Sequence, residues 1–244
     1  MDTQASPPNT PVKTAQTTFR IVEKLKSLDG ATVTELAAEL DLPKSSAHNY
    51  LQTLEHEGYV VNSDGEYKVG LRFLDLGGYA RAQERLYTVA IPEMKRIAAS
   101  TGEFANLLVE EHGLGVFLAR ERGENAVNLD SYTGQSVRLH TTALGKTVLA
   151  YLPRERVESI IDRHGLPAMT DRTITDREEL FDELDEIRQR ECAHDREERI
   201  KGLNCVAVPI LNDGQIAGAL SVSGPVSRMD EARIDEEILP ELRR

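Results

Sequence analysis

The sequence predicts an α+β protein of two domains. Within the first seventy residues, three short helical patterns are followed by a hairpin with a glycine turn. From Tyr87 onward, strand patterns and helix patterns follow one another, and the strands are expected to be antiparallel. A length of 244 residues is enough for two small cores. Residues 1–11 are polar and proline-bearing and are expected to form a disordered lead-in.

The first two helices are short. Residues 14–28 repeat apolar side chains at helical spacing, including Ile21 and Leu25, and Asp29–Gly30 is a typical helix stop. Thr32 and Glu35 then have the spacing of a capping box, in which each side chain accepts from the other residue's backbone N–H. A short second helix is therefore expected to begin at Thr32.

The third helix, expected over residues 43–56, carries the most functional information. Its inward stripe is Ala47, Tyr50, Leu51 and Leu54. The opposite face holds side chains that can hydrogen-bond to base edges, and Asn or Gln can pair bidentately with adenine. A lysine near the helix start can contact a phosphate. The candidate DNA-binding residues on this helix are Lys44, Ser45, Ser46, His48, Asn49 and Gln52.

A hairpin follows this helix and is expected to be the wing. Its turn is Asn62–Gly65, and its second strand carries Lys68, a further candidate for DNA contact. Helices, tight turn and hairpin together predict a winged helix-turn-helix over residues 12–70, the arrangement of many DNA-binding domains. The alternative is a small helical domain whose polar outer face contacts nothing.

The charge distribution is unusual for a DNA-binding protein. The formal net charge is −12, and lysine supplies only 8 of the 29 Lys and Arg residues, a balance typical of proteins from salt-in halophiles such as haloarchaea. An ordinary acidic mesophilic protein is the alternative. Residues 12–72 hold seven Lys or Arg and nine Asp or Glu. The prediction of DNA binding therefore depends on motif geometry and not on a basic patch.

Residues 71–86 are expected to form a linker helix with a flexible point at Gly77–Gly78, or else to be the terminal helix of either domain. The larger domain is expected over residues 87–244. Its expected strands are 104–109, 115–119, 127–130, 206–211 and 215–223, and its expected helices are 91–101, 145–152, 154–163, 176–191 and a last one from about Asp230.

Six segments resemble one known family. Residues 136–150 (SVRLHTTALGKTVLA), 202–210 (GLNCVAVPI) and 219–225 (ALSVSGP) are similar to the effector domain of the isocitrate-lyase regulator (IclR) family. Residues 42–48 and 51–55 resemble its helix-turn-helix, and residues 67–70 resemble the exit of its wing. The resemblance implies a GAF-like effector domain and a homodimer or dimer of dimers on operator DNA. One departure is Asn49, where the family usually has arginine, which affects the expected base preference.

The resemblance also implies an effector pocket. Family effectors are small carboxylates, aromatic acids or sugar-derived acids. By position, the pocket residues are Ala143, Leu144, Gly145, Asp195, Leu203, Cys205, Ser221 and Ser223. The chemistry suits such ligands, because a helix opening at Gly145 favours an anion and two residues that are two apart on a strand point the same way. Asp195 suits a hydroxyl or hydrate on the ligand.

Other readings have less support. Cys205, His140 and Asp195 could act as nucleophile, base and orienting acid, but no motif spacing supports catalysis. Gly145–Lys146–Thr147 lacks the first glycine of a phosphate-binding loop, and the histidines are too scattered for a metal site. No enzyme activity, cofactor or metal is therefore expected. The charged run 188–201 is expected to be a solvated face, and a protein-interaction module without a DNA target is a further alternative.

The cellular location is inferred from absences. Two cysteines are too few for a disulfide framework. The sequence shows neither the pattern of a signal peptide nor an apolar run long enough to span a membrane. A cytoplasmic protein without membrane contact is expected.

Overall fold

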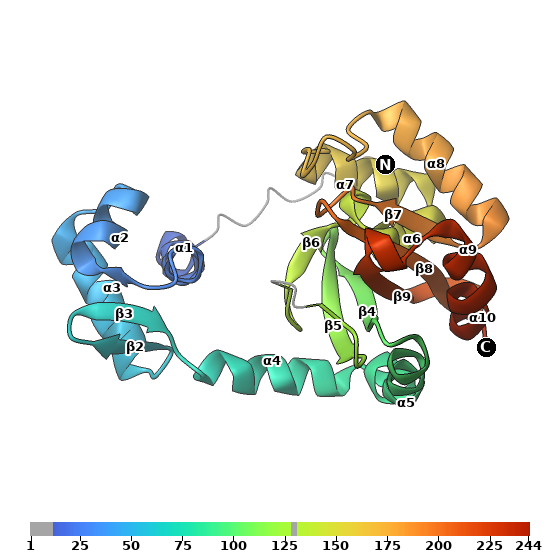
Figure 1. The fold of residues 1–244 in the computed structure, drawn as a ribbon. Helices are drawn as coiled ribbons and strands as arrows, with labels where there is room; N and C mark the ends of the chain where they lie inside the picture. Colours follow the sequence, from blue (N-terminus) through green and yellow to red (C-terminus); the bar gives the residue numbers. More distant parts are fainter. Residues whose placement is uncertain (1–11, 128–130) are drawn as a thin grey trace. The chain divides into compact units, whose positions relative to one another are not determined.

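The computed structural model describes residues 12–127 and 131–244, so the predicted lead-in over residues 1–11 lies outside the described residues. The chain forms two compact units, Met1–Ala80 and Arg81–Arg244. Figure 1 shows the elements of each unit along the chain. Among the described residues, no helix is both long enough and apolar enough to cross a membrane.

The N-terminal unit is a winged helix-turn-helix, as predicted. Its small antiparallel sheet has the strand order β1-β3-β2 and packs with the helices around a core that includes Ile21, Leu36 and Leu51. The elements are α1 (Lys13–Ser27), β1 (Ala31–Thr32), α2 (Val33–Leu40), α3 (Lys44–His56), β2 (Val60–Ser63) and β3 (Glu66–Val69).

Local interactions explain the boundaries of α2 and of the hairpin. The Thr32 hydroxyl accepts a hydrogen bond from the Glu35 backbone N–H at 3.3 Å, and the Glu35 carboxylate accepts from the Thr32 backbone N–H at 2.9 Å, which confirms the capping box. The wing turns through Asp64 and Gly65, which both have positive φ, as a two-residue hairpin turn requires. Strand β1 is only two residues long and was not predicted.

The C-terminal unit is built around one antiparallel sheet of six strands in the order β6-β5-β4-β9-β8-β7. The helix α4 (Arg72–Gln83) spans the boundary between the units. The elements that follow are α5 (Arg85–Thr101), β4 (Phe104–Glu111), β5 (Leu114–Arg122), β6 (Ser136–Arg138), η1 (Leu139–Thr141), α6 (Ala143–Tyr151), α7 (Arg154–His164), α8 (Arg177–Arg190), β7 (Ala193–Arg196), β8 (Leu203–Asn212), β9 (Gln215–Pro225), η2 (Val226–Arg228), α9 (Glu231–Arg233), η3 (Ile234–Ile238) and α10 (Leu239–Leu242).

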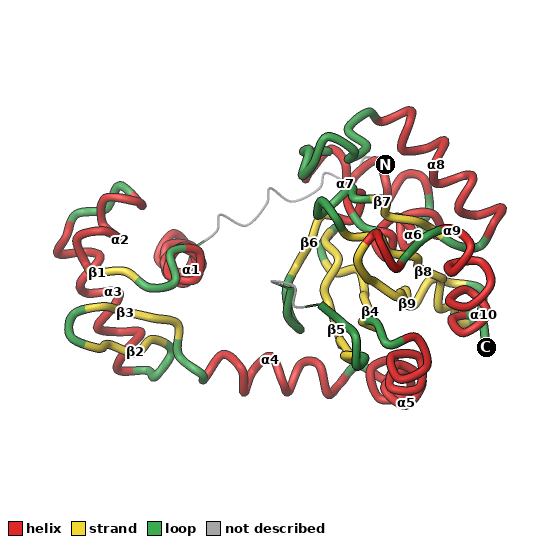
Figure 2. The backbone as a smooth tube through the Cα atoms, in the orientation of Figure 1, coloured by secondary structure: helices red, strands yellow, loops and turns green. Residues whose placement is uncertain are grey.

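Each face of this sheet has its own hydrophobic core. Helices α6, α7 and α8 cover one face, where Leu108, Val148 and Leu184 are buried together. Helix α5 and the C-terminal helical segment cover the other face with Met94, Val222 and others. Figure 2 shows helices on both sides of the strands. This confirms the α+β class, because all the strand pairings are antiparallel.

The predicted linker helix over residues 71–86 differs from the structure. One helix, α4, continues through Gly77–Gly78 without a break and ends at Gln83, and Glu84 is extended. The next helix begins at Arg85, not at Ile91, and it includes Pro92 in its interior. Burial explains the earlier start, because Leu86 and its neighbours pack against the sheet core.

Further differences concern short strands and one helix start. The strand predicted over residues 127–130 is not present at Val127, and residues 128–130 lie outside the described residues. Strands β6 and β7 were missed because each is only three or four residues long and carries charged or polar side chains. Helix α6 begins at Ala143, two residues before the predicted start, because the Thr142 side chain caps it.

Candidate DNA-binding surface and effector site

Helix α3 presents a polar surface that lies opposite its buried side. Ala47, Leu51 and Leu54 are buried, as the helical period predicts. On the other side Lys44, Ser45, His48, Asn49 and Gln52 are exposed, and Ser46 is partly exposed. The six predicted residues of this helix therefore lie on one exposed surface, and their side chains are of the types that bond to bases and phosphates.

Lys68 is placed differently from the other candidates. It lies on β3, where its ammonium group is 3.2 Å from the Glu66 carboxylate, and its side chain lies against Gly30. A neighbouring carboxylate reduces the positive charge that Lys68 can offer to a phosphate. The structure therefore brings together the six α3 residues, whereas Lys68 belongs to the sheet beside them.

In the C-terminal unit, strand register places most of the predicted effector residues on one sheet face. Asp195 on β7 pairs with Cys205 on β8, and Cys205 pairs with Ser223 on β9. Ser221, two residues before Ser223, points to the same face. This is the face covered by α6, since Cys205 belongs to the core that contains α6.

Two further polar residues on this face were not predicted. Asn106 on β4 pairs with Ser221, and its amide nitrogen donates to the hydroxyl groups of Ser221 at 3.3 Å and Ser223 at 3.0 Å. Arg120 on β5 pairs with Asn106 and donates from Nε to its amide oxygen at 2.9 Å. A lone asparagine within the apolar strand 104–109 was the sequence signal for this network. We call Asn106, Arg120, Asp195, Cys205, Ser221 and Ser223 the polar face.

Asp195 is a buried carboxyl group on β7 that bonds to the turn after this strand. Its side-chain oxygen accepts a hydrogen bond from the Glu198 backbone N–H at 2.8 Å. Burial, together with the nearby Glu198 carboxylate, raises the pKa of Asp195 to about 7. Near neutral pH this group can therefore both accept and donate a hydrogen bond, which suits a hydroxyl group on a ligand.

Cys205 does not have the properties of a nucleophile. Burial raises the pKa of its thiol. A thiol kept protonated cannot supply the thiolate that catalysis needs. The proposed base His140 is instead engaged by the backbone carbonyl of Pro167, 3.1 Å from its Nε2. Among residues 12–127 and 131–244, no cluster of three or more potential metal ligands is found.

The start of α6 explains why glycine stands at position 145. The Gly145 backbone N–H donates to the Thr142 hydroxyl at 2.9 Å. A Cβ at this position would lie 2.1 Å from the Leu139 carbonyl oxygen, so no side chain fits. Gly145 therefore allows close packing, and its N–H is already paired. Ala143 and Leu144 are buried at the same helix end, and Leu203 is buried at the start of β8.

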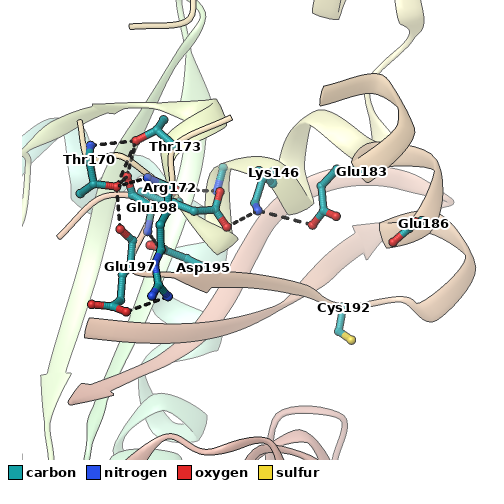
Figure 3. Close-up of polar contacts among 12 residues, drawn as sticks. Lys146, Thr170, Arg172, Thr173, Glu183, Glu186, Cys192, Asp195, Glu197 and Glu198 are labelled. Carbon is teal, nitrogen blue, oxygen red and sulfur yellow. Dashed lines mark hydrogen bonds and ion pairs between the residues drawn. The ribbon is translucent and has the colours of Figure 1, made fainter. Parts of the chain in front are cut away.

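The charged run 188–201 is not a solvated face throughout, so that prediction is wrong for the buried residues around Glu198. Glu198 lies in the interior, with one carboxylate oxygen 2.6 Å from Nζ of Lys146 (Figure 3). Lys146 is 1% exposed and also lies 3.4 Å from Glu183. The run comprises the end of α8, β7 and the turn after it. Asp195 and Glu198 are buried because β7 is the edge of the sheet beneath α6 and α8, whereas Arg188, Arg196 and Lys201 are exposed.

A cavity of about 260 Å³ lies beside this sheet edge. Asp195 and Cys205 contribute to its lining, together with Asn204, Met229 and Ile234 and other residues of the C-terminal segment. The hydroxyl groups of Ser221 and Ser223 are instead buried and bonded to Asn106. A ligand that bonds to these two hydroxyl groups would therefore replace the hydrogen bonds that Asn106 donates to them.

A recognition helix in a winged domain, joined to a separate domain with a buried polar face, defines a DNA-binding transcriptional regulator with an effector-binding domain. Family comparisons agree with this class. Residues 14–64 match the IclR helix-turn-helix domain, and residues 80–244 match the bacterial transcriptional regulator IclR C-terminal domain. The chain belongs to the IclR family of transcriptional regulators.

Individual relatives extend this similarity over nearly the whole chain. A probable HTH-type transcriptional regulator ArcR of Halobacterium salinarum is 32% identical, over 89% of this chain and 85% of the relative. The crystal structure of the Thermotoga maritima IclR is 29% identical with a TM-score of 0.74, covering 95% of this chain and 94% of that one. An IclR homologue from Microbacterium hydrocarbonoxydans complexed with 4-hydroxybenzoate is 25% identical with a TM-score of 0.74, covering 93% and 94%.

Proposed function

We propose that this regulator reads a specific operator with the exposed face of α3 and that a small organic acid bound at the C-terminal polar face changes its operator affinity. The observation that carries the proposal is the one-sided burial of α3, which leaves Ser45, Asn49 and Gln52 free to contact bases in a major groove. Lys44, Ser46 and His48 add phosphate or base contacts from the same surface, and Lys68 adds one from the wing when its ammonium group exchanges Glu66 for a phosphate.

The effector site is proposed at the polar face, with the start of α6 beside it. Asp195, Cys205, Ser221 and Ser223 lie side by side through the strand register, and Ala143, Leu144, Gly145 and Leu203 provide backbone and apolar contacts. Hydroxyl, amide and carboxyl groups at one site favour a hydroxylated acid, such as a sugar-derived acid. The relative complexed with 4-hydroxybenzoate supports an organic acid as ligand.

A homo-oligomer, a dimer or a dimer of dimers, is the proposed DNA-binding form. Apolar side chains along α4 and just before it are exposed, with Leu71 84%, Leu74 69% and Tyr79 70% exposed. Such a stripe supports pairing of two copies through this segment. Effector binding would then favour one placement of the paired recognition helices, and a coupling of roughly 1–3 kcal/mol is enough for regulation.

The experiment has two stages, both in high potassium chloride. Footprinting upstream of the gene and its neighbours locates the operator, and fluorescence anisotropy then measures affinity for it with and without small acids chosen from a thermal-shift screen. A protected operator whose affinity changes with an acid supports the proposal. Absence of any protected sequence, or affinity that no stabilising acid changes, contradicts it.

Two variants assign the effector response to the polar face. Ser221→Val removes a hydroxyl group that accepts from Asn106, so we expect it to abolish the response to the acid while operator binding remains. Ser159→Ala, an exposed hydroxyl on α7, is the matched control and should respond as the wild type does. A Ser221→Val protein that still responds would exclude this site.

A further inference from the structure

Arg199 has no ionic or hydrogen-bonding partner for its guanidinium group among the residues that the structure describes. It lies in the turn between β7 and β8, next to Glu198, and is only partly exposed. The Arg199 side chain lies over an aromatic ring, with its Cζ 5.4 Å from the centre of the Phe117 ring. Burial lowers the pKa of Arg199, and Asp195 and Cys205 are near enough to act on it electrostatically. A guanidinium group has five donors, so this one has capacity for an anion.

Arg120 approaches the same ring from the sheet. Its Cζ lies 5.7 Å from the centre of the Phe117 ring and 4.6 Å from that of Phe104. It donates to Asn106 and to the backbone carbonyl of Ser131, both neutral acceptors. Burial lowers the pKa of Arg120, and the nearby charge of Arg199 lowers it further. No carboxylate of the described residues forms an ion pair with either arginine.

This arrangement differs from a second arginine cluster of the unit. Arg228 and Arg233 converge on the buried Glu103 carboxylate, with nitrogen–oxygen distances of 2.7 and 3.1 Å. There the chain itself supplies the anion that two neighbouring cations need. Within residues 12–127 and 131–244, no carboxylate forms an ion pair with Arg120 or Arg199, and Asp195, the acidic group of the polar face, has its pKa raised toward neutrality. Two partly desolvated like charges are costly unless an anion joins them.

We propose that Arg120 and Arg199 form a second anionic subsite of the effector site, so that the effector carries two acidic groups. This inference rests on the proposed function, because it assumes that an organic acid binds at the polar face. One acidic group lies between the two guanidinium groups, against the Phe117 ring. The ligand's hydroxyl groups and first carboxylate reach Ser221, Ser223 and the start of α6. The second group is a carboxylate or a phosphate ester, since both accept paired N–H donors.

The test compares acids that differ only in the second charge. Isothermal titration calorimetry of the full chain, at constant potassium chloride and pH, measures the dissociation constants of malonate, succinate, malate and glutarate. Each is compared with its monomethyl ester, which keeps the length and loses one charge. 2-Phosphoglycerate and glycerate form a parallel pair that distinguishes a phosphate ester from a second carboxylate. We expect at least one diacid to bind ten-fold or more tightly than its partner.

Substitutions then locate the subsite. Arg199→Gln and Arg120→Gln keep hydrogen-bonding capacity and remove the charge, so each should erase the preference for the diacid while affinity for the monoester changes less than about three-fold. Arg163→Gln, an exposed arginine on α7, is the matched control and should keep the preference. Arg120 also contacts Asn106, so thermal unfolding of each variant is measured alongside.

The outcomes separate this inference from the proposed function. If a diacid and its monoester bind equally to the wild type, or if Arg199→Gln weakens both equally, the second subsite is wrong and the proposed function stands. If a preferred diacid binds through Arg199 without altering operator affinity, the subsite stands and the proposed regulation is wrong. If no acid of either type binds, both are wrong.

Discussion

Nζ of Lys146 lies 2.6 Å from a carboxylate oxygen of Glu198, and both side chains are buried beneath α8. The second oxygen of Glu198 is buried without a hydrogen-bond partner among the described residues. This pair ties the start of α6 to the turn that follows β7, which are the two segments that flank the polar face. Its integrity therefore affects both the stability of the unit and the geometry of the effector site.

Lys146→Met should destabilise the C-terminal unit by about 3–5 kcal/mol, because it leaves the Glu198 carboxylate buried without its cation. Urea unfolding followed by circular dichroism gives this difference. Lys201→Met is the control, since Lys201 pairs with Asp171 at the surface, where both side chains are about 70% exposed. The control should change the free energy of unfolding by less than about 1 kcal/mol. Equal effects of the two substitutions would contradict a buried ion pair.

His194 and Asp195 should give opposite pH dependences of stability. Burial lowers the pKa of His194 from 6.5 to about 4, so stability from this group is present above pH 6.5 and is lost as the pH falls toward 4. The pKa of Asp195 is raised from 3.8 to about 7, so folding is favoured at low pH and this advantage is lost as the pH rises toward 7. Between about pH 4 and 6.5, His194 therefore makes the free energy of unfolding rise with pH, whereas Asp195 makes it fall.

Single variants separate the two groups. In Asp195→Asn, the free energy of unfolding should rise with pH between 4.5 and 6.5 more steeply than in the wild type, by up to about 1.4 kcal/mol per pH unit. In His194→Gln it should fall with pH over the same range. Urea titrations at several pH values measure both. Parallel pH profiles of the two variants and the wild type would refute these assignments.

Asn49→Ala should weaken specific operator binding by about 1–3 kcal/mol and relax the base preference at one position, because it removes a group that can bond to a base edge. Anisotropy titrations with operator and single-base variants measure both effects. Gln16→Ala, an exposed polar residue of α1, should leave operator affinity within about 0.5 kcal/mol of the wild type. Unchanged affinity and preference in Asn49→Ala would exclude base reading by this side chain.

Operator binding should persist at high potassium chloride concentration. Few cations are available for phosphates, and Lys24, Lys26 and Lys68 already pair with glutamates. A plot of log affinity against log salt should therefore have a slope shallower than about −3. Lys44→Gln should make the slope shallower by about 0.9, the effect of one phosphate contact. Loss of binding above a few hundred millimolar salt would show that phosphate contacts dominate instead.

The same substitution at two glycines should have opposite effects. Gly145→Ala places a Cβ 2.1 Å from the Leu139 carbonyl oxygen and should destabilise the C-terminal unit by about 3 kcal/mol. Gly77→Ala, inside α4 with no atom within 4 Å of the new Cβ, should instead stabilise that helix by about 0.5–1 kcal/mol. Thermal unfolding compares the two. A neutral Gly145→Ala protein would show that the close contact between α6 and η1 is absent.

The sequence by itself determined the elements whose signals are local. The capping box at Thr32, the glycine turn of the wing and the buried stripe of α3 follow from interactions within a few residues, so the winged helix-turn-helix could be predicted from them. The alternation of Ser221 and Ser223 on one strand face followed from the two-residue period in the same way.

Only the tertiary structure decided what depends on pairings between distant segments. Asn106 joined the polar face because β4 pairs with β9, the strand that carries the serines more than one hundred residues away, and Arg120 joined it because β5 pairs with β4. Glu198, in the middle of a charged run, is buried because the sheet edge lies beneath α6 and α8, where Lys146 offsets its charge. Helix α5 begins earlier in the sequence than predicted because Leu86 packs against the hydrophobic core on this face of the sheet. Burial of a charged or short segment depends on what packs over it, and neighbouring residues in the sequence do not report that.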